Sequence, residues 1–296
     1  MTFTEQLARA EARNDSLLCV GLDPDPAKFP LQWRGDARRI FSFCATIVDA
    51  TADLVLAFKP QIAYFAAHRA EAQLEQLVAH MHRVAPDVPV ILDAKRGDIG
   101  STAEQYAVEA FERYGADAVT VSPFMGFDSI EPYLQRHPDK GVILLCRTSN
   151  PGGSDLQAQR LAAADGSPGD LVYEHLARCA AGSWNRTGQL GLVVGATYPA
   201  EIARVRELAP TLPLLIPGVG AQGGDAASTV QAGWRQQTGR TTGAIIVNSS
   251  RAVLYVSDGP DHAVAARRAA LATRDELRAA QQAVRSSASD ATQLRR

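Results

Sequence analysis

The sequence predicts a single (β/α)8 barrel, and two observations carry this prediction. Short apolar runs rich in β-branched residues recur along the 296 residues, and most precede a longer segment with helical periodicity. Runs that are apolar throughout are typical of parallel strands covered on both faces, and their alternation with helices indicates a parallel sheet. The eight runs are Leu17–Leu22, Leu54–Phe58, Val88–Leu92, Ala118–Val121, Val142–Cys146, Leu190–Val194, Leu212–Ile216 and Ala244–Val247.

Eight strand–helix units favour a closed barrel, which commonly runs to about 250 residues, over an open doubly wound sheet. The open sheet is the alternative, but no GxGxxG motif follows the first run to support it. The helical pattern is found in the segments Ala37–Ala50, Ala67–Val84, Thr102–Tyr114, Leu171–Trp184, Ala200–Leu208 and Ala226–Gln231.

The barrel domain is expected to occupy residues 1–275, and residues 276–296 are expected to form a helical or flexible tail. Residues 1–16 contain three acidic residues and no apolar core, so they predict a short amphipathic helix rather than a signal peptide. After the fifth strand, residues 150–169 are rich in Gly and Pro. They predict a long loop, and loops of that length are usually functional or disordered.

Composition and charge exclude several classes of partner. The chain has 30 Lys and Arg against 32 Asp and Glu, a net charge of −2, so no overall basic field attracts nucleic acid or a membrane surface. No apolar stretch approaches the ~20 residues of a membrane span. The cysteines are scattered without a CxxC motif, which predicts reduced thiols and a cytoplasmic setting. They are Cys19, Cys44, Cys146 and Cys179.

Charged residues follow the first three predicted strands. Asp23 follows the first, Lys59 the second, and Asp93, Lys95 and Asp98 the third. Active sites of (β/α)8 barrels lie at these carboxyl ends. Asp93 and Lys95 are two apart on a strand and should face the barrel mouth together. Neighbouring carboxylates favour the ammonium form of Lys95, which predicts a general acid, although an ion-pair network that only stabilises the barrel end is the alternative.

A phosphate site is expected after the last two strands. The glycine-rich turn Gly218–Gly224 precedes a helix and can offer backbone N–H groups to an anion. Arg251 follows the eighth strand and can add a charged contact at a frequent phosphate position in barrels. The alternatives are a tight turn that needs positive φ and an arginine that pairs with a surface acid.

Together these motifs resemble orotidine 5′-monophosphate decarboxylase, and more closely its longer bacterial subfamily with the sequence DAKRGDI. The similarity runs from about Leu17 to Tyr255. Its motifs, in order, are Asp23, FKPQ at 58–61, DAKRGDI at 93–99, PGVGAQG at 217–223 and Arg251.

The resemblance implies conversion of orotidine 5′-monophosphate to UMP and CO2 in pyrimidine biosynthesis, with no metal or organic cofactor. Lys59, Asp93, Lys95 and Asp98 would form a charged tetrad, in which Lys95 protonates the C6 carbanion. A homodimer with shared sites is also implied, in which Asp98 reaches into the partner's site.

The same resemblance implies the residues that bind the substrate. Asp23 and Lys59 would contact the ribose hydroxyls, Ser149 the pyrimidine ring, and Ile99 and Thr102 the site of the partner subunit. The phosphate would be bound by Gly220, Gln222 and Arg251. The stretch 150–169 is longer than in compact members of the family.

Two other functions are alternatives to this one. A related sugar-phosphate decarboxylase or synthase barrel shares DxKxxD but uses Mg²⁺, and it needs an acidic ligand after the second strand, where this chain has Lys59. A non-catalytic nucleotide-phosphate binder is the second alternative, although such a protein has no use for a proton donor. His80 and His82 are two apart on a helix and make a poor metal pair, so no metal site is predicted.

Overall fold

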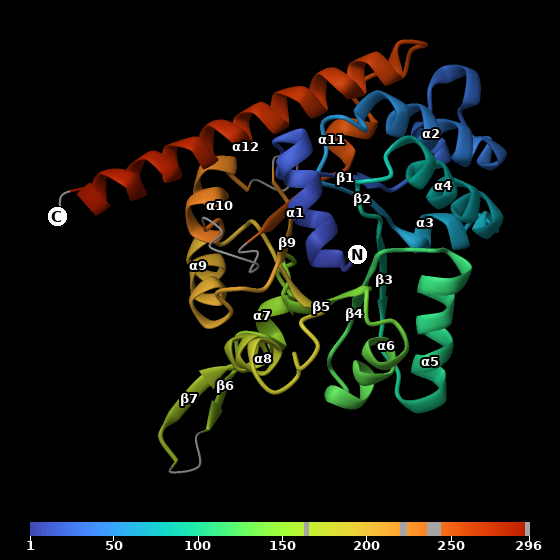
Figure 1. Ribbon diagram of the computed structural model, residues 1–296. Helices are drawn as coiled ribbons and strands as arrows, with labels where there is room; N and C mark the ends of the chain where they lie inside the picture. Colours follow the sequence, from blue (N-terminus) through green and yellow to red (C-terminus); the bar gives the residue numbers. More distant parts are fainter. Residues whose placement is uncertain (163–165, 220–223, 236–243, 294–296) are drawn as a thin grey trace.

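Eight parallel strands form the centre of the computed structural model, which describes the chain except residues 163–165, 220–223, 236–243 and 294–296. Parallel bridges from Phe58 to Val90 and from Gln61 to Asp93 join the two outer strands of the sheet, so it closes into the predicted barrel (Figure 1). The strands are β1 (Leu18–Leu22), β2 (Ala57–Pro60), β3 (Ile91–Arg96), β4 (Ala118–Val121), β5 (Gly141–Arg147), β8 (Leu190–Val194), β9 (Leu214–Pro217) and β10 (Ile245–Ser249).

Helices surround the barrel, and each predicted helical segment overlaps one of them. They are α1 (Phe3–Asn14), α2 (Ile40–Thr51), α3 (Ile62–Ala66), α4 (Glu71–Val84), α5 (Gly100–Val108), α6 (Glu131–Arg136), α7 (Gly153–Leu156), α8 (Val172–Ala181), α9 (Pro199–Leu208), α10 (Ala226–Gly233), α11 (Arg251–Leu254) and α12 (His262–Gln293). A π-helical turn, Glu109–Arg113, continues α5. Short 3-10 helices lie at Pro26–Lys28, Leu31–Trp33, Ala37–Arg39 and Phe127–Ser129.

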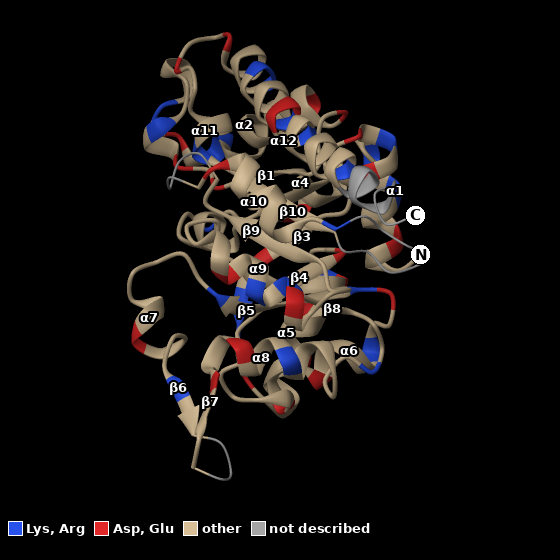
Figure 2. Cartoon of the chain, turned by 90° about the vertical axis from the view of Figure 1, so that its left-hand side faces the viewer, with Lys and Arg blue, Asp and Glu red and all other residues tan. Residues whose placement is uncertain are grey.

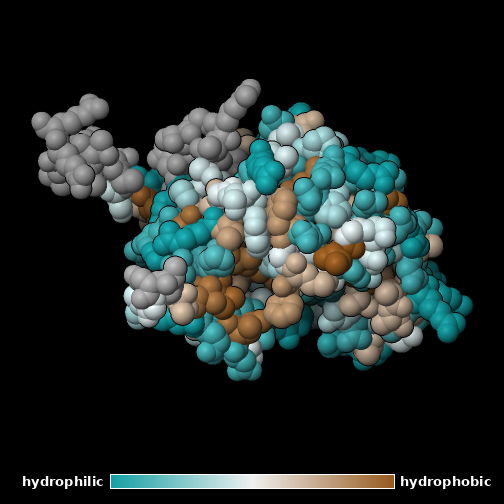
Figure 3. Space-filling view, turned by 90° about the horizontal axis from the view of Figure 1, so that it is seen from below, coloured by the Kyte–Doolittle hydropathy of each residue, from teal (hydrophilic) through white to brown (hydrophobic). Residues whose placement is uncertain are grey.

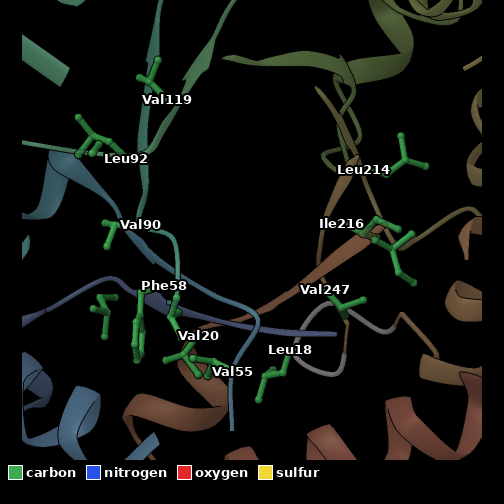
Figure 4. Packing of buried hydrophobic residues seen from close by; sticks show 14 of the residues in the cluster. Leu18, Val20, Val55, Phe58, Val90, Leu92, Val119, Leu214, Ile216 and Val247 are labelled. Carbon is green, nitrogen blue, oxygen red and sulfur yellow. The ribbon is translucent and has the colours of Figure 1, made fainter. Parts of the chain in front are cut away.

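Strand residues alternate between two cores. Leu18, Val20, Phe58 and Leu92 lie on the outer side of the strands, where they pack beneath the helices (Figure 4). Their neighbours point inward, because successive side chains of a strand face opposite sides. The inward set is Cys19, Ala57, Ile91, Ala118, Ile143, Val193, Leu215 and Ile246.

Helix α1 closes the amino-terminal end of the barrel. Its apolar face, Phe3, Leu7 and Ala10, is buried against the inward-facing strand residues. The N–H of Phe3 donates to the carbonyl of Asp139 at 2.8 Å, just before β5 begins. At the first residue of β5, Gly141, a Cβ would lie 2.3 Å from the Phe3 ring. The predicted amphipathic helix is thus confirmed, and the structure shows in addition that it forms the floor of the barrel.

At β2 and β3, which carry charged residues of the predicted site, the predicted strand ends were too early. Strand β2 continues through Lys59, which pairs with Gly21, and β3 continues through Arg96. The prediction ended each strand where its apolar run ended, so it did not include the polar residues that continue β2 and β3. Lys59, Asp93 and Lys95 therefore lie within hydrogen-bonded strands rather than in the loops that follow them.

The stretch 150–169 is not an irregular loop throughout. Helix α7 is followed by an antiparallel hairpin of β6 (Arg160–Ala162) and β7 (Pro168–Leu171). The hairpin projects from the barrel in two perpendicular views (Figures 1 and 2). Two hydrogen bonds at its base, from Val172 N–H to Gln159 and from Tyr173 N–H to Gln157, join it to α8. Three- and four-residue strands among Gly and Pro gave no periodic signal to predict.

Helix α12 runs along the outside of the molecule past α10 and α2 (Figure 1). The buried residues on its inner face include Ala266, Ala270 and Leu277. The predicted division between residues 275 and 276 falls inside this helix, and the division stays a prediction. None of the helices in the described part of the chain is long and apolar enough to cross a membrane. On the face seen in Figure 3, apolar side chains form separate patches among polar ones.

Candidate active site

A pocket of about 170 Å³ opens at the carboxyl ends of the strands. It brings together residues that are far apart in the sequence but that the strand pattern predicted at one rim. Ends of β1, β2, β3, β9 and β10 contribute, with lining residues that include Asp23, Lys59, Asp93, Gly218 and Arg251. Lys59 and Asp93 of the charged cluster thus share one cavity with Arg251 and with Gly218, where the glycine-rich turn begins.

Asp93 is the centre of the charged cluster. Lys59 Nζ donates to Asp93 Oδ2 at 2.8 Å, and Lys95 Nζ donates to Asp93 Oδ1 at 2.5 Å. Lys59 and Asp93 are buried, whereas the Lys95 side chain is 46% exposed. The ammonium of Lys95 is therefore fixed by a buried carboxylate yet accessible from the barrel mouth.

Burial disfavours the charged forms of both Lys59 and Asp93, but the attraction between them is stronger. Burial would raise the pKa of Asp93, yet the ammonium groups of Lys59 and Lys95 hold it well below its usual range. For Lys59, burial would lower the pKa, but Asp93 and Asp23 raise it above its usual value. Lys59 and Asp93 are both ionised at neutral pH as a result.

Lys95 has an unusual backbone conformation. Its φ is +49°, in the left-handed region that residues with a Cβ rarely adopt. The register between β3 and β4 shifts between Leu92 and Arg96, so the strand bulges at this point. We expected Asp93 and Lys95 to face the mouth because of simple alternation along a strand. Their contact is confirmed, but a bulge and a left-handed residue bring it about.

The fourth member of the predicted tetrad does not join the other three within one chain. Asp98 Oδ1 accepts the N–H of Ile99 at 2.8 Å, and no contact from Asp98 to Lys59, Asp93 or Lys95 is found in the described structure. Ile99 and Thr102 are exposed. Of the tetrad, this chain therefore assembles three groups by itself.

Asp23 lies beside the cluster in the loop after β1. Its Oδ1 is buried and has no hydrogen-bond partner among the described residues. An unpaired buried oxygen is costly, so this atom is suited to accept a hydroxyl of a bound ligand. Tyr255 holds the backbone here, since its hydroxyl donates to the Asp23 carbonyl at 2.6 Å and accepts the N–H of Asp25 at 2.7 Å.

The predicted phosphate site is described in part. Gly218 has φ of +103°, which a residue with a side chain would rarely adopt, and Gly224 N–H donates to the Gly218 carbonyl at 3.2 Å. Arg251 is exposed at the first residue of α11. Gly220 and Gln222 lie outside the described residues. Gly218 and Arg251 thus line the same pocket as Lys59 and Asp93.

Ser149 lies after β5, next to a network that the sequence did not reveal. The buried Arg147 donates to Glu201 Oε2 at 2.8 Å and to Ser154 Oγ at 3.1 Å, which ties β5 to α9 and α7. Ser149 itself packs against Gly195, where an added Cβ would lie 2.7 Å from the Ser149 Cβ.

Sequence reasoning missed three residues that shape this site: Thr120, Arg147 and Tyr255. Thr120 was a possible signal, because it is a polar residue inside the apolar run of β4. Arg147 is the last residue of β5, directly after an apolar run, and this position at the catalytic end of a strand was a possible signal. Tyr255 had no signal, since its contact spans 232 positions of the chain.

No group of three or more His, Cys, Asp or Glu in the described part of the chain is arranged to hold a metal ion. A closed eight-stranded barrel with ion-paired lysines at the carboxyl ends of its strands has the architecture of an enzyme of the (β/α)8 class.

Comparison with known proteins gives the family. Residues 16–269 match the profile of the orotidine 5′-phosphate decarboxylase / HUMPS family, and this chain belongs to that family.

Named relatives agree with the family match. The chain is 75% identical over 286 residues to orotidine 5′-phosphate decarboxylase of Leptothrix cholodnii, with 96% of this chain and 100% of that protein covered. It is 73% identical over 280 residues to the enzyme of Variovorax paradoxus, covering 95% and 99%. Among solved structures, OMP decarboxylase of Leishmania donovani superposes with a TM-score of 0.79 at 37% identity, covering 95% and 99%. The barrel predicted from the sequence is thus shared with this solved structure.

Proposed function

We propose that this chain decarboxylates orotidine 5′-monophosphate to UMP and CO2, with Lys95 as the proton donor. The observation that carries the proposal is the fixed ammonium of Lys95, 2.5 Å from a buried carboxylate at the mouth of the barrel. The 75% identity to a decarboxylase over nearly the whole chain supports the same substrate.

The chemistry follows from the charges. When the bond from C6 to the carboxylate breaks, its electron pair stays on C6, and CO2 leaves. Lys95 stabilises that developing negative charge more than the charge of the substrate, and then donates a proton from Nζ to C6. Asp93 orients the ammonium, and Lys59 holds Asp93 in place.

Substrate binding is assigned to the rest of the pocket. The unpaired Oδ1 of Asp23 and the ammonium of Lys59 suit the ribose hydroxyls. Arg251 and the turn that begins at Gly218, with Gly220 and Gln222, would bind the phosphate. Ser149 would contact the pyrimidine ring.

A homodimer completes the tetrad in this proposal. Asp98, with Ile99 and Thr102 beside it, would enter the site of the partner subunit. Ile99, Phe124 and Met125, exposed by 49%, 78% and 46%, follow β3 and β4 at the same rim and offer apolar surface for the contact.

Free buried thiols, such as Cys44 and Cys146, fit a cytoplasmic setting.

The alternative magnesium-dependent barrel is disfavoured by Lys59. Its ammonium is buried at the position where a metal ligand would stand, and it already neutralises Asp93. The second alternative, a silent binder, does not explain an accessible ammonium held at 2.5 Å from a carboxylate.

The assay is loss of orotidine 5′-monophosphate absorbance with and without EDTA. We expect turnover that survives EDTA, is lost in Lys95→Ala, and leaves UMP binding measurable in that variant. Turnover that requires added Mg²⁺ would favour the alternative barrel, and a Lys95→Ala enzyme at the wild-type rate would remove the acid assignment.

Shared sites are tested by mixing subunits. Lys95→Ala and Asp98→Asn should each be inactive, but a mixed dimer contains one site with both native residues. Random reassociation should therefore restore about one quarter of the activity. A mixture that remains inactive after verified exchange contradicts the shared site.

A further inference from the structure

We propose that Thr120 is a positioning residue that holds Asp93 and Lys95 in register for proton transfer, an inference that rests on the function proposed above. Thr120 lies on β4 and is 1% exposed. Its hydroxyl donates to Asp93 Oδ1 at 2.9 Å. It also accepts the backbone N–H groups of Ala94 and Lys95, each at 3.0 Å.

The bulge in β3 explains why this hydroxyl is needed. Leu92 pairs with Val119 and Arg96 with Val121, so β3 advances four residues while β4 advances two. The extra residues of β3 cannot all find carbonyl acceptors on β4. Buried N–H groups without an acceptor are costly, and the Thr120 hydroxyl supplies the acceptor for Ala94 and Lys95.

The same contact holds the left-handed backbone of Lys95. Such a conformation persists only where neighbouring contacts determine it. On the other side of Lys95, the carbonyl of Arg96 accepts the N–H of Ser122 at 2.6 Å. The Arg96 guanidinium also binds Glu109 through two nitrogens, at 2.9 to 3.1 Å. Lys95 is therefore fixed on both sides, and Thr120 is the anchor on the side of Asp93.

A threonine hydroxyl has one donor and two acceptor positions, and Thr120 uses all three. The carboxylate oxygen that it binds, Asp93 Oδ1, is the one that accepts Lys95 Nζ at 2.5 Å. The hydroxyl oxygen of Thr120 thus positions both the backbone of Lys95 and the carboxylate oxygen that binds the Lys95 ammonium. Valine has the same shape and none of these bonds, whereas serine keeps all three.

The test compares Thr120→Val with Thr120→Ser in the absorbance assay. We expect kcat of the valine variant to fall on the order of 10²-fold, because displacement of a catalytic group by about 1 Å has such an effect. KM should change little, since the binding residues are untouched, and serine should restore most of kcat. Thr51→Val is the matched control: Thr51 is buried, and its hydroxyl donates to the Ile47 carbonyl at 2.7 Å within α2, so its kcat should equal that of the wild type.

Wild-type kcat in Thr120→Val, or an equal fall in the serine variant, overturns the inference. Should the valine variant not fold, Thr120→Ala against Thr120→Ser isolates the same oxygen, and equal kcat values in that pair overturn it too. Lys95→Ala, assayed in parallel, separates a failure of the proposed function from a failure of the role of Thr120. If it is active, the acid assignment fails; if it is inactive while Thr120→Val is normal, only the role of Thr120 fails.

Discussion

Tyr255 and Asp23 are joined by a hydrogen bond of 2.6 Å, from the tyrosine hydroxyl to the aspartate carbonyl. Tyr255 follows α11, the helix that begins at Arg251. Its ring stacks on Phe43 of α2, with centroids 6.0 Å apart and planes 8° from parallel. The loop with the predicted ribose ligand is thereby coupled to the segment with the predicted phosphate ligand.

Removal of this hydroxyl should therefore weaken substrate binding more than chemistry. For Tyr255→Phe we expect KM to rise by roughly tenfold, the effect of about 1.4 kcal/mol, with a smaller change in kcat. Steady-state kinetics check this. Tyr133→Phe is a suitable control, because the Tyr133 hydroxyl is buried without a hydrogen-bond partner in the described structure. A Tyr255→Phe enzyme with unchanged KM contradicts the coupling.

The ion pair of Asp93 and Lys59 should govern stability at acid pH. The folded pKa of Asp93 lies below its unfolded value of about 3.9, so its contribution is present above that pH and is lost as the pH falls toward the folded pKa. Asp93→Asn leaves Lys59 buried without its counter-charge, and we expect a loss of about 3 kcal/mol at neutral pH. Urea unfolding between pH 7 and pH 2 measures both effects. A variant whose stability falls with acid as steeply as that of the wild type argues against this assignment.

Gly195 should be intolerant of a side chain. A Cβ there would lie 2.8 Å from the backbone nitrogen of Ser149, so Gly195→Ala must displace the predicted pyrimidine ligand. We expect kcat/KM to fall by at least about tenfold. Gly152→Ala is the control, because a Cβ at Gly152 would meet its nearest neighbour at an ordinary 3.5 Å. Equal kcat/KM values for the two variants would show that the contact has no effect on activity.

Arg206 should be a stability residue remote from the mouth. It is 1% exposed and donates to carbonyls of Gly233, Leu212 and Ala244, among others, at 2.7 to 3.2 Å. Arg206→Met leaves these acceptors unpaired, so we expect a loss of about 3 kcal/mol of unfolding free energy. In Arg204→Met the lost contacts are with Glu207, which is exposed, and with the buried Glu174, which keeps the Leu171 N–H as a partner, so the loss should be smaller, about 1 kcal/mol. Thermal unfolding of the two variants measures this difference. Similar unfolding midpoints for Arg206→Met and Arg204→Met would contradict it.

The fold could be predicted because apolar periodicity is a local property. Each strand of the barrel could be recognised from its own apolar run. The polar residues that follow these runs then predicted that Asp23, Lys59 and Asp93 lie at one rim. The β6–β7 hairpin escaped prediction because its strands have only three and four residues, too few to show an apolar alternation.

The finer geometry of the site was not predictable in the same way. The left-handed Lys95 and the hydroxyl of Thr120 depend on the register between two strands, and a register shift leaves no trace in composition. Asp98 is a different case. Its side chain binds the N–H of Ile99 within this chain, and its role in the site of a partner subunit stays a prediction.

Because Lys59 and Asp93 are placed by strands that pair directly, their electrostatic field is preorganised when the barrel folds. Solvent and protein dipoles then need little reorientation when charge develops on a ligand. Contacts with distant parts of that ligand are therefore not required to assemble the charged pair.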